Sequence, residues 1–425
     1  MNHHVTLFVF SSLFVSVCGI NHFLDTFETL NYRPLSISRT KRSIDGTLRP
    51  MKLKFRSHNR TFHLHLEPIE EGFDVFADDF YVDEDGRDVN QHVKPHRFLF
   101  NGYRSAEQTD SSHAPEDQHG CGLNSRIRRD MEQIQNSGES NLDQYFEEFS
   151  SRYSNDSRSK RSLSVPVDMI DNRPIHRVRT CSIYMQADQK LYEHILHKEG
   201  NGNPVRTREE IVSLFYNHIK AVNLIYESTD FRGIRGLNFV IQRTSIFTPD
   251  SCHRGRPTPG SDNPFCEENV DVSNYLNMNS QRNHSAFCLA YALTFRDFVG
   301  GTLGLAWVAS PNHNTAGGIC QIYQRYNEGS RGWVFRSLNT GIVTLVNYGN
   351  RVPTRVSQLT LAHEIGHNFG SPHDFPLECQ PGLPDGNYII STETALLKHY
   401  GQTQLFPRKN FCLLWKSDQR AWRRV

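Results

Sequence analysis

The sequence predicts an α/β fold in which long helices pack on a single sheet, preceded by a β-rich region. Two observations predict it. After residue 161, apolar segments with the period of a strand alternate with apolar segments with the period of a helix. Before residue 161, short segments alternate apolar and polar side chains, which is typical of half-buried strands. The hydrophobic content of 37% and the charged content of 22% are those of a globular protein.

The charge balance excludes some classes of function. Lys and Arg number 47 and Asp and Glu number 46, so we expect no basic face and no nucleic-acid partner. Apart from residues 5–20, no segment approaches 18 consecutive apolar residues, so we expect no transmembrane segment in this chain. Residues 390–425 carry seven Lys or Arg residues and two Asp or Glu residues, and we interpret them as a divergent basic tail.

Residues 1–19 are predicted to be a secretory signal peptide. The run Val5–Ile20 is apolar and uncharged, too short for a membrane span, and contains the small Val17 and Gly19 near its end. A buried helix or an anchor is the alternative. We expect a protein of the secretory pathway, secreted or at the cell surface, where disulfides form. Three glycosylation sequons, at Asn59, Asn155 and Asn283, agree with this location.

Two R-x-K-R tetrapeptides, which end at Arg42 and Arg161, divide the remaining chain. Proprotein convertases cut this form of sequence, so we expect a convertase as an activating partner. A solvated basic loop is the alternative, but the polar, Ser-rich segment 141–164 suits an exposed and cleavable linker. Residues 20–161 are then a prodomain, and the chain is a zymogen.

The predicted strands of the prodomain begin with a hairpin. Its first strand has Leu53 and Phe55 alternating with Lys, and a turn is expected over residues 57–60. Its second strand has Phe62, Leu64 and Leu66 alternating with His. Shorter strands are predicted around Phe73, Val75, Phe80 and Val82.

Strands and helices then alternate after residue 161. Strands are predicted at Ile183, Met185 and Ala187 and over residues 237–241, 287–293, 303–309 and 342–346. A capping box over Thr207–Glu210 is expected to begin a helix with Ile211, Leu214, Phe215, Ile219, Val222 and Ile225 on its apolar face. A second helix is predicted over Val356–Phe369. The Pro-, Gly- and Ser-rich segment 252–266 is expected to be a loop.

The second helix carries a predicted metal site. His363 and His367 are four residues apart, so both imidazoles lie on one face, about 6 Å from each other. Gly370 can end the helix with a positive φ, which lets the chain return and bring His373 to the same ion. Three imidazoles leave one position of a tetrahedral Zn²⁺ for water, as in catalytic zinc sites. Glu364 lies on a neighbouring face and is predicted to be the general base toward that water.

Asp374 follows the third histidine and is expected to fix the turn through a hydrogen bond or a salt bridge. The whole motif is the metzincin signature, and Asp374 resembles the adamalysin (reprolysin) branch. Further segments resemble the Kuzbanian-type ADAM proteases, the α-secretase class. These segments are residues 303–309, 317–320, 337–342, 347–349 and 362–374. The resemblance is dense over residues 180–389 and looser in the prodomain.

The resemblance implies a metzincin-like zinc protease domain over residues 162–389, with a mixed and mostly parallel sheet. It implies that this domain hydrolyses peptide bonds in the ectodomains of membrane proteins, including Notch-type receptors. It also implies an edge strand on which an extended protein substrate lies. An open strand edge suits this role because it offers unpaired amides and carbonyls. The edge-strand residues are Leu303, Gly304, Leu305, Ala306 and Trp307.

The resemblance also assigns roles to cysteines. It implies a disulfide between Cys181 and Cys288. It implies that Cys121 is a cysteine switch, whose thiolate holds the fourth zinc position until the prodomain leaves; a structural disulfide or a free thiol is the alternative. Cys252 and Cys266 have no counterpart in the family, so we pair them with each other. The partners of Cys320, Cys379 and Cys412 are left open.

The chain departs from the family pattern at Ile390, which stands in the place of the Met beneath the zinc. Ile can fill that space with some loss of fit. Residues 391–425 match no expected pattern, and the disintegrin module, the Cys-rich module and the membrane helix are not found. An alternative function therefore stays open, that of a truncated isoform or a catalytically inactive, soluble zinc-binding decoy.

Overall fold

The computed structural model describes part of the chain. The described ranges are 36–39, 51–57, 60–68, 75–89, 100–102, 121–138, 169–170, 173–174, 179–231, 234–310, 316–373 and 389–390. The predicted signal peptide and the basic tail lie outside these ranges. So do Arg42, Asn59, Asn155, Arg161 and Asp374.

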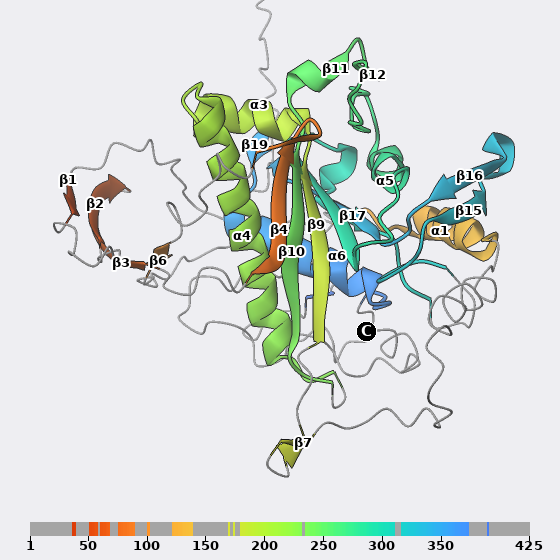
Figure 1. Ribbon diagram of the computed structural model, residues 1–425, viewed down its shortest axis with the longest axis horizontal. Helices are drawn as coiled ribbons and strands as arrows, with labels where there is room; N and C mark the ends of the chain where they lie inside the picture. The colour runs from red at the N-terminus through yellow and green to blue at the C-terminus, as the bar shows by residue number, and fades with distance from the viewer. Residues whose placement is uncertain are drawn as a thin grey trace, which may run out of the picture.

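A seven-stranded sheet forms the centre of the described structure (Figure 1). Its strands are β4 (Phe76–Glu84), β5 (Arg87–Asp88), β9 (Arg179–Ala187), β10 (Leu237–Ile246), β13 (Leu289–Thr294), β14 (Gly304–Ala306) and β17 (Thr340–Thr344). Their order across the sheet is β14-β17-β13-β9-β10-β4-β5. The five strands from β17 to β4 run parallel, whereas the outermost strands β14 and β5 are antiparallel to their neighbours. The predicted α/β class with a mixed, mostly parallel sheet is confirmed.

Helices cover both faces of this sheet. They are α1 (Ser125–Asn136), α3 (Gln189–Lys198), α4 (Pro204–Ser228), α5 (Val272–Ser280) and α6 (Thr354–Asn368). Residues of α4 and α6 share one hydrophobic cluster with Val343, whereas residues of α1 and α5 share another with Ile342. These two neighbours in β17 point to opposite faces because side chains alternate along a strand. The sheet is therefore the middle layer between the two helical layers.

The beginning of α4 corrects one prediction. The predicted capping box at Thr207 is wrong, because α4 begins three residues earlier, at Pro204. Asn203 caps the helix by accepting a hydrogen bond from the Arg206 amide at 3.2 Å, and Thr207 donates its hydroxyl to the Asn203 carbonyl. Asn followed by Pro is a stronger start signal, since Pro needs no amide partner in the first turn.

Other boundaries differ from the predicted ones. The predicted strand over residues 303–309 is a strand only over Gly304–Ala306, and the one predicted over 237–241 continues to Ile246. Helices α1, α3 and α5 were not predicted. Both differences arise because pairing partners and packing, which lie far away in the sequence, decide where short elements end.

Part of the predicted prodomain belongs to the central sheet. The strands β1 (Ser36–Arg39), β2 (Met51–Ser57), β3 (Arg60–Pro68) and β6 (Phe100–Gly102) form a separate antiparallel sheet, with β2 and β3 in the predicted hairpin. In contrast, β4 pairs in parallel with β10 of the protease region. Figure 1 shows β4 (orange) beside β10 (green). The sequence did not predict this pairing across residue 161.

The remaining strands form short antiparallel pairs. They are β7 (Met169–Ile170) with β8 (Arg173–Pro174), β11 (Cys252–His253) with β12 (Arg256–Pro257), β15 (Gln324–Asn327) with β16 (Trp333–Arg336), and β18 (Val346–Asn347) with β19 (Asn350–Arg351). No helix among the described residues is long and apolar enough to cross a membrane.

Candidate metal centre

Helix α6 presents His363, Glu364 and His367 to the interior, and all three are buried. The helix ends at Asn368, and Gly370 follows with a φ of +90°, which few residues other than glycine adopt. The Gly370 amide donates to the His367 carbonyl at 2.8 Å, and the Ser371 amide donates to the Gly366 carbonyl at 2.9 Å. These bonds reverse the chain, so that His373 returns to the two helical histidines as predicted.

The three imidazoles converge through their Nε2 atoms. The Nε2 atom of His367 lies 3.0 Å from that of His363 and 3.2 Å from that of His373, and the latter two are 3.3 Å apart. A tetrahedral zinc ion with Zn–N bonds of about 2.0–2.1 Å separates its nitrogen ligands by roughly 3.3 Å. The spacing of these donors therefore fits one zinc ion.

Backbone carbonyls orient two of these rings. The Nδ1 atom of His363 lies 2.7 Å from the Ile389 carbonyl, and that of His367 lies 2.6 Å from the Ser371 carbonyl. A carbonyl only accepts, so each Nδ1 carries the proton and each Nε2 has a free lone pair. Burial lowers the pKa of His363 to about 4, and burial together with the two neighbouring histidines lowers the pKa of His367 well below its ordinary value. Both rings are therefore neutral, as metal ligands must be.

The structure places Cys121 beside the histidines. Its Sγ atom is 3.5 Å from the Nε2 of His367, and these ligand atoms with those of His363 and His373 all lie within 4.8 Å of one another. A sulfur and a nitrogen on one tetrahedral zinc are about 3.6 Å apart. Burial and the nearby Glu364 raise the pKa of the Cys121 thiol, so a cation is needed to hold it as a thiolate.

The carboxyl group of Glu364 is fully buried next to the histidines. Neither oxygen makes a well-formed hydrogen bond with the described residues. Burial has the larger effect on this group and raises its pKa to about 8, although the Cys121 thiol lies near enough to lower the pKa in part. A buried carboxyl group without a well-formed hydrogen bond is costly. The position of Glu364, buried next to the histidines, leaves its predicted role as general base a prediction.

The predicted edge strand lies against this carboxylate. A Cβ atom on Gly304 would be 2.8 Å from both the Cγ and the Oε1 of Glu364, so only glycine fits. Leu303, Leu305, Ala306 and Trp307 are buried, and the Trp307 indole donates to the Ser280 hydroxyl at 2.9 Å. Their buried side chains hold the strand in place, so a neighbouring segment meets its backbone rather than its side chains.

The segment around Cys121 pairs with that backbone. Cys121 forms a parallel bridge with Gly304, and the Gly122 amide donates to the Gly304 carbonyl at 2.8 Å. The predicted prodomain therefore lies along the same strand that is predicted to bind the substrate.

Sequence reasoning missed the next part of this contact, helix α1. The Gln135 side chain, which is buried, donates to the carbonyls of Val308 and Ala316, both at 2.7 Å. The spacing of Ile127, Met131 and Ile134 is helical and could have predicted α1. Nothing in the sequence indicates which carbonyls Gln135 meets, because they are more than 170 residues away.

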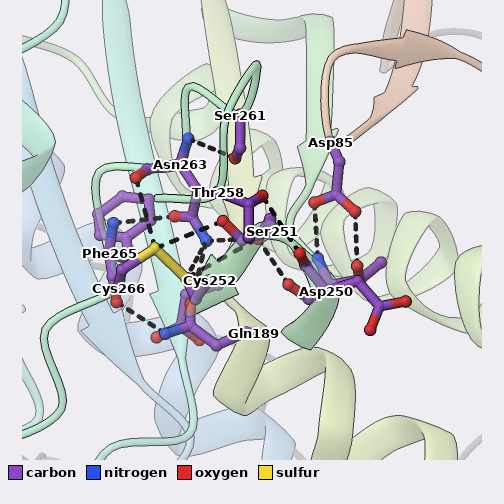
Figure 2. The surroundings of a disulfide bond; sticks show 12 residues. Asp85, Gln189, Asp250, Ser251, Cys252, Thr258, Ser261, Asn263, Phe265 and Cys266 are labelled. Carbon is purple, nitrogen blue, oxygen red and sulfur yellow. Dashed lines mark hydrogen bonds between the residues drawn. A yellow bond between two sulfur atoms is a disulfide. The ribbon is translucent and has the colours of Figure 1, made fainter. Parts of the chain in front are cut away.

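Both predicted disulfides are present. Cys181 and Cys288 join β9 to the start of β13, and Cys252 and Cys266 close their own loop (Figure 2). Cys320 forms no disulfide among the described residues, and Cys379 and Cys412 lie outside them.

Two further predicted positions are described. Asn283 is exposed, as a glycosylation site requires. Ile390 is only 1% exposed and belongs to the main hydrophobic core, and its neighbour Ile389 supplies the carbonyl that orients His363. Ile390 thus packs in the same hydrophobic cluster as Ala362 and Ile365 of α6.

Comparisons with known proteins identify the family. The reprolysin model of metallo-peptidase family M12 matches residues 177–401, more than half of the chain, and continues past the boundary predicted at residue 389. The disintegrin and metalloproteinase domain-containing protein 10 homolog of Caenorhabditis elegans is 54% identical over 455 residues, which cover 91% of this chain and 48% of that protein. The human disintegrin and metalloproteinase domain-containing protein 10 is 42% identical over 218 residues, 50% of this chain and 26% of its own length.

The chain spans about half the length of the worm relative, and its match to the human relative covers 26% of that protein. The matched region contains the whole histidine cluster and its Glu364. The chain therefore belongs to the reprolysin-type metallo-peptidase family M12 and resembles, among the disintegrin and metalloproteinase (ADAM) proteins, protein 10.

Proposed function

We propose that this chain is the zymogen of a zinc-dependent metalloendopeptidase. The observation that carries the proposal is the convergence of three imidazoles, two of them kept neutral by burial, beside the buried carboxyl group of Glu364. His363, His367 and His373 would hold a zinc ion, which would act as a Lewis acid toward water and a peptide carbonyl. Glu364 takes the proton from the attacking water and passes it to the leaving amine.

We further propose that the substrate is an extended segment in the ectodomain of a membrane protein, with Notch-type receptors as one class. An extended peptide can add to the outer edge of β14, whose inner edge already pairs with β17. The ectodomain assignment rests on the resemblance to the disintegrin and metalloproteinase proteins. The expected place of action is the secretory pathway and the cell surface, reached through a signal peptide over residues 1–19.

The prodomain, residues 20–161, is proposed to hold the enzyme inactive. The Cys121 thiolate would occupy the fourth zinc position, and Gly122 would fill the place of the substrate backbone on Gly304. A convertase cut after Arg161, with a second cut after Arg42, would begin activation. Asp374, next to the third ligand, is proposed to fix the turn that carries His373.

A peptide assay tests this function. Residues 20–425 are expressed, cut after Arg161 and mixed with a quenched fluorescent peptide. We expect activity that a chelator removes and zinc restores, and Glu364→Gln should lower kcat by about 10²–10⁴-fold with zinc content unchanged. Glu193→Gln, at a partly exposed surface carboxylate, is the control and should retain activity. One bound zinc ion with no turnover would instead support the inactive decoy.

A further inference from the structure

A second contact between the predicted prodomain and the protease lies at the opposite edge of the sheet from the metal centre. Residues 75–89 form the β4–β5 unit, which covers the edge of β10. The Ile241 amide donates to the Val75 carbonyl at 2.6 Å, and the Asp85 amide donates to the Ile246 carbonyl at 3.0 Å. Four strands, β17, β13, β9 and β10, lie between β4 and the strand β14 that contains Gly304 and pairs with Cys121.

Apolar side chains of this unit complete the core of the protease region. Val75 and Val82 are at most 1% exposed, and Phe76 stacks on Tyr216 of α4 with ring centroids 5.7 Å apart. All of them belong to one cluster with Ile241 of β10. Loss of the unit would expose this apolar surface together with the unpaired edge of β10, both of which favour rebinding.

Charged and polar contacts give this edge a specific register. Glu84 accepts from Arg208 of α4 at 2.7 Å, and both side chains are less than 20% exposed. Asp83 accepts from Arg243 at 3.0 Å and from the Ser245 hydroxyl at 2.7 Å. The acidic groups all come from the prodomain side and the basic groups from the protease side, so the two surfaces are complementary.

The turn after β4 adds a third anchor. The Asp85 carboxylate accepts from the Thr248 amide at 2.9 Å and from the Thr248 hydroxyl. Figure 2 shows Asp85 reaching the segment that leads from Asp250 into the disulfide-closed loop at Cys252. The disulfide between Cys252 and Cys266 restrains the loop that follows the Thr248 contact.

We propose that the edge of β10 is a docking surface for residues 75–89 that acts separately from the metal centre and keeps the prodomain bound after the chain is cut at Arg161. The proposal rests on the proposed function, in which residues 20–161 are the inhibitory segment. Both contacts lie in that one segment, before the cut. Binding at β10 therefore raises the local concentration of Cys121 at the metal centre, and the cut alone does not release it.

The test measures whether the two fragments stay together in the cut full-length chain. Residues 158–161 are replaced by the site of a sequence-specific protease, so that the cut does not depend on convertase recognition. Gel filtration gives the fraction of the prodomain that co-elutes with the protease, and dilution gives the rate at which it leaves. No substrate is needed, so failure of peptidase activity and failure of docking are seen separately.

Three variants decide the outcome. Glu84→Arg should release the prodomain at least about tenfold faster, since one partner of a desolvated ion pair is lost. Asp78→Arg, at an exposed position of the same strand, is the matched control and should behave as wild type. Cys121→Ser should still co-elute after the cut, because the β10 contacts remain.

The double variant Glu84→Arg with Arg208→Glu separates a lost contact from a misfolded protein. It restores the ion pair with reversed signs and should slow the release again. The proposal is overturned if Cys121→Ser alone releases the prodomain. It is also overturned if the prodomain dissociates at the same rate in the Glu84→Arg and Asp78→Arg variants.

Discussion

Gly304 links the edge strand to the proposed general base. Its Cα lies so close to Glu364 that an added Cβ would sit 2.8 Å from Oε1, and 2.9 Å from the Thr360 side chain. The same residue pairs with Cys121 and accepts from the Gly122 amide. The absence of a side chain at this one position therefore allows the base, the edge strand and the prodomain to meet.

We expect Gly304→Ala to lower kcat/KM by about tenfold or more, because Glu364 must move and general-base catalysis depends on its position. The histidines are not displaced, so zinc content measured by atomic absorption should be unchanged. Peptide hydrolysis by the activated enzyme is the measurement. Unchanged kcat/KM in a variant that retains its zinc would contradict the packing argument.

At the scale of the element, α1 of the proposed prodomain contacts the loop after β14. Gln135 donates hydrogen bonds to the partly buried Val308 carbonyl and the buried Ala316 carbonyl. Gly317, with a φ of +113°, leaves the space for the Gln135 amide. Helix α1 is thereby anchored by a polar contact as well as by its apolar face.

Gln135→Ala should weaken docking of the proposed prodomain by about 1–3 kcal/mol, since one buried and one partly buried carbonyl lose their donor. The measurement is the residual peptidase activity of the uncut zymogen, which should rise. Gln133→Ala, on the exposed face of the same helix, is the control and should leave this activity unchanged. Equal activity of the two variants would count against the contact.

His218 joins α4 to α6 and makes stability depend on pH. Its Nε2 atom lies 2.8 Å from the Ser357 hydroxyl, and burial lowers its pKa to about 4 from an ordinary value of 6.5. The folded protein keeps this ring neutral, whereas the unfolded chain protonates it below pH 6.5. Stability is therefore complete above pH 6.5 and falls as the pH drops toward 4.

The expected loss from this one ring is about 2 kcal/mol in the free energy of unfolding between pH 7.5 and pH 5. Urea unfolding of wild type and His218→Gln at both pH values measures it. The variant should lose less stability on acidification by about that amount, while contributions of the metal ligands cancel in the comparison. The same pH dependence in both proteins would exclude His218 as a cause.

At the scale of the whole molecule, the two disulfides restrain the unfolded chain to different extents. Cys181 and Cys288 are 107 residues apart, whereas Cys252 and Cys266 are separated by 14. Replacement of the first pair by Ala should cost about 5 kcal/mol of unfolding free energy, and of the second about 3 kcal/mol. Urea unfolding of the two double variants measures both, and a reversed order would contradict the loop-length argument.

The histidine site was predictable because its geometry is local. Four residues bring His363 and His367 to one face of any α-helix, and Gly370 has a conformation that its residue type favours. The capping box at Thr207 failed for an equally local reason, since Asn203 and Pro204 form a better cap. Local signals thus predict well where no stronger signal competes nearby.

The sequence by itself determined the histidine cluster, the proposed base, the α/β class and the family resemblance, because these depend on spacings within single elements and on motifs. Only the tertiary structure decided that β4 joins β10, that Gln135 reaches Val308, and that Gly304 touches Glu364. The physical reason is distance along the chain. Such contacts join segments that have no common local pattern, and they form only when hydrophobic burial and backbone pairing are satisfied together in the folded molecule.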